Sequence, residues 1–131
     1  MYKIEKRPSG YILTFGGVIN ATEMQNWYND SQNALSTETT SSFGVIIDMR
    51  DLMPISQETQ TIMVSGQGLY KQKGMKRSAV ILASAAISMQ FKKIAQESGI
   101  YATERYIDAS YFANPIDVAI KWVKDAIDPD L

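Results

Sequence analysis

The sequence predicts an α/β fold in which four helices cover a mixed, mostly parallel five-stranded sheet. Two continuous apolar runs, at residues 45–47 and 79–82, are typical of strands buried on both faces. Segments with helical spacing of apolar residues alternate with these runs, which favours parallel strands joined by right-handed crossovers. A hairpin at residues 2–15 adds one antiparallel strand. The expected order is β-β-α-β-α-β-α-β-α, in a single domain over residues 1–131.

The first elements carry clear local signals. Apolar and polar residues alternate at the start of the chain and again after Gly10, and Pro8 and Gly10 fit a turn between these two strands. Asn20 and Glu23 have the spacing of a capping box. We therefore expect a hairpin followed by an amphipathic helix over residues 21–35.

The later elements are bounded in similar ways. A buried strand is expected at residues 43–48, Ser56 can cap the second helix, and Gly74 can end it. Gly99 closes a third helix and is followed by a short edge strand at residues 103–108. The last helix begins with Asn-Pro at residues 114–115. Its predicted apolar stripe consists of Ile116, Ala119, Ile120, Val123 and Ile127.

The composition excludes several kinds of chemistry. The chain has no Cys and no His, so disulfides, thiolate nucleophiles, His-based triads and His metal clusters are ruled out. Only carboxylates could hold a metal ion, which would favour Mg²⁺ or Ca²⁺. The net charge of −1 lacks the basic surplus with which nucleic-acid-binding proteins neutralise phosphates. We therefore expect no cofactor and no nucleic-acid partner.

No targeting or membrane-spanning segment is evident in the sequence. The first residues lack the apolar stretch of a signal peptide, and no run approaches the roughly 18 apolar residues of a membrane span. The main basic cluster consists of Lys71, Lys73, Lys76 and Arg77. It suits the C-terminus of the second helix, where cations favour the helix dipole; contact with an anionic partner or membrane surface is the alternative. We expect a cytoplasmic protein without stable membrane insertion.

The order of elements resembles the SpoIIAA-like branch of the STAS superfamily. The best-matching segments are residues 47–52, 76–80 and 119–123, and the resemblance extends over residues 3–124. It implies the STAS fold and a regulatory module, most often bacterial, that interacts with proteins. The superfamily includes anti-sigma-factor antagonists and the cytoplasmic tails of anion transporters. For the SpoIIAA-like branch the resemblance also implies a small apolar or lipid-like ligand as an alternative.

The sequence departs from the antagonist pattern at the start of the second helix. Antagonist STAS domains carry an Asp-Ser pair there, and a partner kinase phosphorylates the serine. In this chain the two positions fall on Ser56 and Gln57, so the switch serine is absent from its expected place. We interpret Ser56 as an N-cap, with a regulatory phosphosite at Ser56 as the alternative.

A polar candidate site lies after the first buried strand. Asp48, Arg50 and Asp51 are at its carboxyl end, which is where ligands bind in open α/β sheets. Together with Ser56 they form a candidate strand-end loop that could hold Mg²⁺ or a phosphate. An ion-paired strand end is the simpler interpretation, since no further acidic pair or lysine motif accompanies them. A carboxylate-dependent phosphoryl-transfer or hydrolytic enzyme is therefore the least favoured hypothesis.

A second set of candidate residues is mainly apolar. Gly66 lies on the stripe of the second helix, where glycine costs about 1 kcal/mol relative to Ala, so close packing on the sheet or an approaching ligand should require it. Met89 lies off its helix stripe, and two adjacent aromatics occupy a loop, which indicates a contact surface or a hydrophobic plug. The candidate contacts for an apolar ligand or a partner are Met63, Gly66, Tyr70, Met89, Tyr111 and Phe112.

Taken together, these patterns favour a non-enzymatic interaction or regulatory module. Its expected partner is another protein or a second copy of the chain in a homodimer. A carrier or sensor of a small apolar or lipid-like ligand is the alternative hypothesis. The first hypothesis requires an exposed contact surface, whereas the second requires a cavity between the sheet and the second and third helices.

Overall fold

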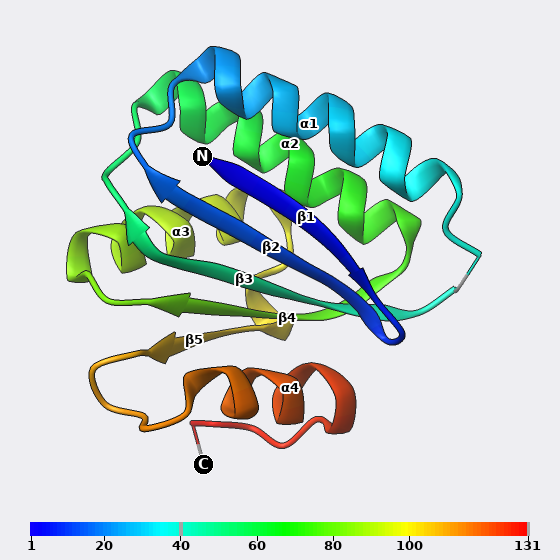
Figure 1. Ribbon diagram of the computed structural model, residues 1–131, viewed down its shortest axis with the longest axis vertical. Helices are drawn as coiled ribbons and strands as arrows, with labels where there is room; N and C mark the ends of the chain where they lie inside the picture. The colour runs from blue at the N-terminus through cyan, green and yellow to red at the C-terminus, as the bar shows by residue number, and fades with distance from the viewer. Residues whose placement is uncertain (40, 131) are drawn as a thin grey trace.

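The five strands lie in the sheet in the same order as in the chain, β1-β2-β3-β4-β5. A computed structural model describes residues 1–39 and 41–130. β1 and β2 form the predicted antiparallel hairpin and all later neighbours are parallel, so the sheet is mixed (Figure 1). The strands are β1 (Tyr2–Arg7), β2 (Gly10–Gly17), β3 (Phe43–Leu52), β4 (Met75–Leu82) and β5 (Glu104–Asp108).

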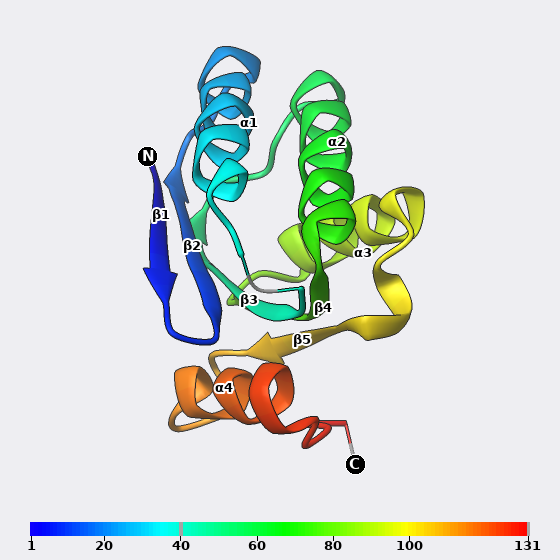
Figure 2. The same cartoon turned by 90° about the vertical axis from the view of Figure 1, so that its right-hand side faces the viewer.

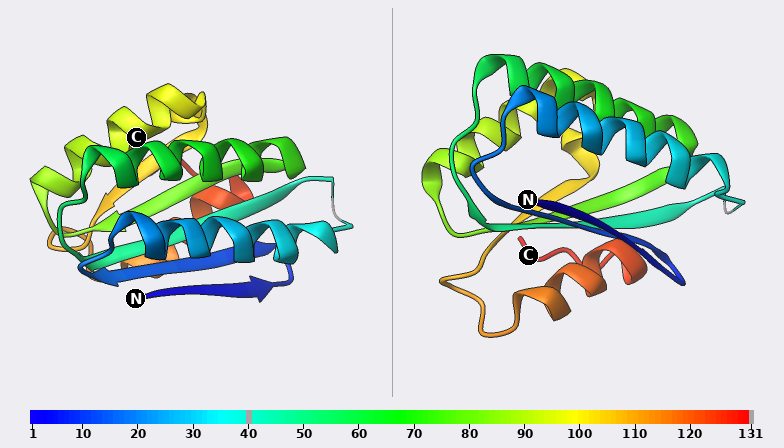
Figure 3. Two further views of the ribbon diagram at one scale, coloured as in Figure 1. Left: turned by 90° about the horizontal axis from the view of Figure 1, so that it is seen from above. Right: turned by 45° about the horizontal axis from the view of Figure 1, so that its top comes forward.

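Three helices cover one face of the sheet and a single helix covers the other. Figure 2 shows α4 on the side opposite to α1, α2 and α3, and Figure 3 shows α1 and α2 side by side along the sheet. The predicted sandwich of the central strands is confirmed, but its two layers are unequal. In the described part of the chain, no helix is both long and apolar enough to span a membrane. The helices are α1 (Ala21–Ser36), α2 (Gln57–Lys73), α3 (Ala85–Ser98), the short 3₁₀ helix η1 (Tyr101–Thr103) and α4 (Pro115–Asp125).

Side-chain caps begin the helices where the sequence predicts them. Oγ of Ser56 accepts a hydrogen bond from the backbone N–H of Thr59 at 3.1 Å, and Oδ1 of Asn20 accepts one from that of Glu23 at 2.9 Å. The Glu23 carboxylate does not complete the capping box, because it pairs with the N-terminal amino group at 2.9 Å. Gly74 ends α2 with φ = +118°, a left-handed conformation that glycine adopts without strain.

β3 extends beyond the predicted strand 43–48. The prediction ends too early because the burial pattern changes along the strand. The first half lies between the two helix layers and is buried on both faces. Past Asp48, Met49 and Leu52 still pack in the core beneath α1, α2 and α3, whereas Arg50 is exposed. The change from a continuous buried run to separate buried residues, with both Arg50 and Asp51 exposed between Met49 and Leu52, therefore concealed the end of the strand.

Trp27 of α1 is central to the larger core, between the sheet and the three helices. Its ring stacks on Tyr70 with centroids 6.0 Å apart and meets Phe15 edge to face at 5.4 Å. A Cβ at Gly66 would lie 2.1 Å from Cζ3 of Trp27. Close packing is thus the reason for this glycine, but its neighbour is α1 and not the sheet.

We expect Gly66→Ala to lower the free energy of unfolding by about 1–3 kcal/mol, the usual cost of overfilling a packed core. The buried Trp27 ring has little room to move away from the added methyl group. Gly68→Ala is the matched control, because a Cβ there meets nothing within 4 Å and should stabilise α2 by about 0.5–1 kcal/mol. Urea unfolding measures both. Equal effects of the two substitutions would contradict this account of Gly66.

The predicted stripe of α4 is partly wrong. Ala119 and Trp122 are buried against the sheet, whereas Ile120 is 40% exposed and Ile127 lies beyond the end of the helix and is also exposed. The indole Nε1–H of Trp122 donates to the backbone oxygen of Ser78 at 2.9 Å. This hydrogen bond satisfies the polar end of a large apolar ring, so the rotation of α4 follows Trp122 and not the isoleucines.

Candidate functional site

Asp48 and Arg50 form a closed ion pair at the end of β3. Residues two apart on a strand share a face, and the Arg50 guanidinium holds the carboxylate through Nε to Oδ1 at 3.1 Å and Nη2 to Oδ2 at 2.8 Å. These hydrogen bonds raise the pKa of Arg50. Asp51 is exposed on the same strand. The two hydrogen bonds make this an ion-paired strand end. Within residues 1–39 and 41–130, no three acidic side chains converge to hold a metal ion.

The exposed Ser56 acts as the N-cap of α2. Its Oγ accepts from the backbone of Thr59, and it shares a second hydrogen bond with Oγ1 of Thr59 at 2.9 Å. The next residue is Gln57, on which the sequence analysis places the antagonist switch serine, and it accepts a hydrogen bond from Nζ of Lys93 at 3.2 Å. The start of α2 is therefore bound to α3 through a neutral amide.

Met63, Gly66 and Tyr70 lie in the core and not on a ligand-accessible wall. The hydroxyl of Tyr70 is 2.8 Å from Oγ of Ser31, and burial raises the Tyr70 pKa to about 12. The space enclosed between these residues, Trp27 and the sheet is about 10 Å³, which suffices for roughly one water molecule. This part of the structure contains no cavity for the lipid-like ligand of the alternative hypothesis.

Met89, Tyr111 and Phe112 lie outside that core. Met89 and Tyr111 are 74% and 80% exposed. Phe112 is partly buried against the smaller core cluster beneath α4, and it meets the ring of Tyr111 edge to face with centroids 5.0 Å apart. The two loop aromatics therefore differ: Phe112 plugs the core and supports Tyr111, which faces solvent.

Four exposed apolar side chains lie at one edge of the sheet. The carboxyl ends of β2, β3, β4 and β5 meet there, at the left of Figure 1. The segment that follows each of these strands contributes one large side chain that is between 55% and 80% exposed. We name this set the carboxyl-edge residues: Val18, Met53, Met89 and Tyr111. Sequence analysis missed Val18 and Met53, although both directly follow a strand and precede a helix cap.

No family model and no curated protein matches the chain. Among solved structures, it is similar to the anti-sigma factor antagonist SpoIIAA in its unphosphorylated form, with a TM-score of 0.58 over 90% of this chain and 97% of that chain. The chain has a SpoIIAA-like fold. This confirms the fold that the sequence predicted, and at 10% identity the likeness shows the fold alone.

The SpoIIAA-like fold of this chain contains a buried acid, Glu104, that sequence analysis missed. Glu104 begins β5 and is 2% exposed, and its carboxyl accepts hydrogen bonds from Ser78 at 3.0 Å and Tyr106 at 2.8 Å. Burial raises its pKa to about 7 against the opposing effect of these two hydrogen bonds. The hydroxyl of Tyr106 also lies 3.5 Å from the backbone oxygen of Phe91. The Tyr106 hydroxyl can therefore accept a hydrogen bond from a protonated Glu104 carboxyl while it donates one to the backbone oxygen of Phe91.

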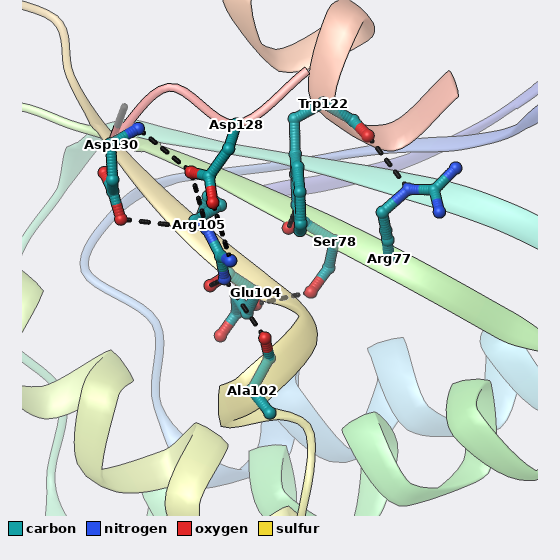
Figure 4. A network of polar contacts seen from close by, with 8 residues as sticks. All are labelled: Arg77, Ser78, Ala102, Glu104, Arg105, Trp122, Asp128 and Asp130. Atoms are coloured by element: carbon teal, nitrogen blue, oxygen red, sulfur yellow. Dashed lines mark hydrogen bonds and ion pairs between the residues drawn. The ribbon is translucent and has the colours of Figure 1, made fainter. Parts of the chain in front are cut away.

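A polar network surrounds this acid and links β4, β5, α4 and the segment after α4 (Figure 4). Trp122 lies between two guanidinium groups, with those of Arg105 and Arg77 at 4.2 and 5.8 Å from its ring. Arg105 also binds the carboxylate of Asp128 at 2.9 and 3.0 Å, which lowers the pKa of Asp128. The network fixes the edge of the SpoIIAA-like sheet against α4.

Two members of the predicted basic cluster, Lys71 and Arg77, bind backbone oxygens at the C-termini of helices. These helices are α3 and α4 and not the predicted α2. Arg77 donates to the backbone oxygens of Trp122 at 2.9 Å and Val123 at 3.2 Å, at the end of α4. Lys71 donates to that of Gly99, after α3, at 3.1 Å. The expected match of cations with helix dipoles is present, and it joins three helices of the SpoIIAA-like fold.

We expect the stability of the protein to fall as pH rises from about 4.5 to 7, and Glu104→Gln to remove this dependence. The folded protein binds more protons than the unfolded chain between these values, because the carboxyl pKa moves from its ordinary 4.5 to about 7 on folding. The contribution of Glu104 to the free energy of unfolding is fully present below pH 4.5 and is lost as the pH rises through 7. It amounts to up to about 3 kcal/mol. Urea unfolding at a series of pH values measures it.

The control for this experiment is Glu97→Gln, which neutralises an exposed acid on α3. It should leave the slope of stability against pH as it is in the unmodified protein. An unchanged slope in Glu104→Gln would show that Glu104 is not the group responsible.

Proposed function

We propose that this chain is a non-enzymatic regulatory module that binds a partner protein along its carboxyl edge. The observation that carries the proposal is the exposure of the carboxyl-edge residues, one after each parallel strand. These side chains lie on successive connections at one edge of the sheet, so a broad partner surface would contact several of them together. Methionines suit such a surface, because the flexible thioether adapts to different partners.

The polar residues near this edge support a binding role over a catalytic one. Asp48 is engaged by Arg50 in two hydrogen bonds, and Ser56 is engaged as a helix cap. Neither group is paired with a base or an acid that would activate it. The structural neighbour SpoIIAA is an anti-sigma factor antagonist, so a regulatory role through protein contact agrees with the fold. The resemblance also supports the cytoplasm of a bacterium as the setting.

A second copy of the chain is the competing occupant of this edge. A homodimer would bury the same side chains, since symmetric pairs present one surface to itself. The experiment must therefore separate a partner of another kind from self-association.

We expect a photo-crosslinker at position 53 or 89 to capture a partner protein in cells of the source organism, because both side chains are exposed at the proposed contact. The matched control is position 73, an exposed lysine at the opposite edge of the sheet. Mass spectrometry of the adducts reads out the partner. An adduct with another protein at 53 and 89 but not at 73 supports the proposal, and an adduct of two copies overturns it in favour of a homodimer.

Met53→Lys and Met89→Lys test the same surface without a crosslinker. Because both side chains face solvent, we expect the free energy of unfolding to change by at most about 0.5 kcal/mol. Affinity for the captured partner should fall at least about tenfold in the double variant, since two charges would be desolvated in the contact. Unchanged affinity in a folded double variant would contradict the proposed position of the interface.

A further inference from the structure

α4 leaves a groove between itself and the hairpin, on the face of the sheet away from α1, α2 and α3. The turn between β1 and β2 lies beside the C-terminal end of α4 in Figures 1 and 3. The groove has a volume of about 430 Å³, within the range of about 300–1,000 Å³ typical of small-molecule sites. It lies at the amino ends of the parallel strands, opposite to the carboxyl-edge residues.

The middle of this groove is aliphatic. Ile12 of β2 and Ile46 of β3 form its floor, and Ile120 and Val123 of α4 form its wall. Ile120 is 40% exposed because it lines this open groove, and it is therefore not part of the buried face of α4. At one end the helix is held close to the sheet, since a Cβ on Gly44 would lie 2.7 Å from Cβ of Val123. The groove is therefore formed by well-packed elements and is not a loose gap.

The charged end of the groove is positive. Among the described residues, Arg7 and Lys124 are the charged side chains that line it, and both are cations. Arg7 has one exposed ion pair, with Glu5 at 3.2 Å, and such surface pairs contribute little and exchange easily. The backbone oxygen of Val123 is already bound by Arg77, so the helix end does not require Lys124 as a cap.

We propose that this groove binds a small amphipathic anion, namely an aliphatic carboxylate. The carboxylate would pair with Arg7 and Lys124, and its chain would lie over Ile12, Ile46 and Ile120. An aliphatic tail next to a charged head matches an apolar trough that ends in two cations. The proposal does not depend on the protein contact at the carboxyl edge, because the two sites lie at opposite ends of the strands.

NMR of the full chain with labelled isoleucine methyl groups tests the proposal, with decanoate below its micelle concentration as the probe. We expect saturable shifts at Ile12, Ile46 and Ile120. Ile87 and Ile94, in the core on the other face, are internal controls in the same spectrum. Decanol, which lacks the charge, and butanoate, which lacks the tail, should each bind at least about tenfold more weakly.

Three substitutions separate the head from the tail. Lys124→Gln and Arg7→Gln should each weaken decanoate binding about tenfold, as expected when one charge-assisted contact is lost. Lys121→Gln is the matched control: it removes a neighbouring cation of α4 that pairs with Asp117 and does not line the groove. Ile120→Asp should abolish binding, and its own spectrum shows whether it is folded.

Several results would overturn the proposal. These are an absence of shifts at the three groove methyls, equal binding of decanol and decanoate, or an affinity that Lys124→Gln leaves unchanged. Groove shifts that follow protein concentration without decanoate would instead assign the groove to a second copy of the chain.

Discussion

The single helix on the second face of the sheet is the constraint on which much of this structure depends. A helix about 10–12 Å wide covers two or three strands that are about 4.8 Å apart, and α4 packs on β3, β4 and β5. β1 and the second half of β3 therefore face water on that side. They carry ion pairs there, Glu5 with Arg7 and Asp48 with Arg50, and the border between the covered and open halves is the groove along α4.

The two ends of the sheet consequently differ in character. At the carboxyl ends of the strands, single apolar side chains project from four successive connections, and the pocket there, between the ends of β4 and β5 and the start of α3, is lined mainly by polar and small side chains. At the amino ends, the hairpin and the last turns of α4 enclose a trough with a positive end. The first arrangement suits the broad surface of a protein, whereas the second suits a small molecule with one charge. The SpoIIAA-like fold can present both because β2, β3, β4 and β5 run parallel, which places all their carboxyl ends at one edge of the sheet and all their amino ends at the other.

Most of the fold could be predicted from the sequence, because its signals are local. The solid runs around Ile46 and Val80 show burial on both faces, and Ser56 and Gly99 mark helix ends by their own hydrogen bonds or backbone preference. The Asp48–Arg50 pair was also foreseeable, since a spacing of two on a strand places both side chains on one face. These features depend on neighbours within a few residues.

What could not be predicted depends on partners far along the chain. The rotation of α4 follows from the indole of Trp122 meeting a backbone oxygen of β4, and its isoleucine spacing contains no trace of this contact. The neighbour of Gly66 is Trp27, which lies on another helix far along the chain. The sequence does not reveal this contact, and it therefore predicts close packing of Gly66 on the sheet instead. An acid at the start of an edge strand would ordinarily be solvated, so Glu104 gave no signal of burial. The groove is assembled from three separate segments, each of which is ordinary by itself.

The contacts of Arg105 have a consequence for how molecules of this protein behave in a crowded solution. The outer side of β5 has no neighbouring strand in the described sheet, and free backbone groups on such a strand can recruit strands from other molecules into aggregates. Nη1 of Arg105 donates to the backbone oxygens of Ala102 at 3.1 Å and Glu104 at 3.0 Å, while Asp128 holds the same guanidinium in place. A strand that adds at the start of β5 would therefore have to displace the Arg105 guanidinium that the Asp128 carboxylate holds in place.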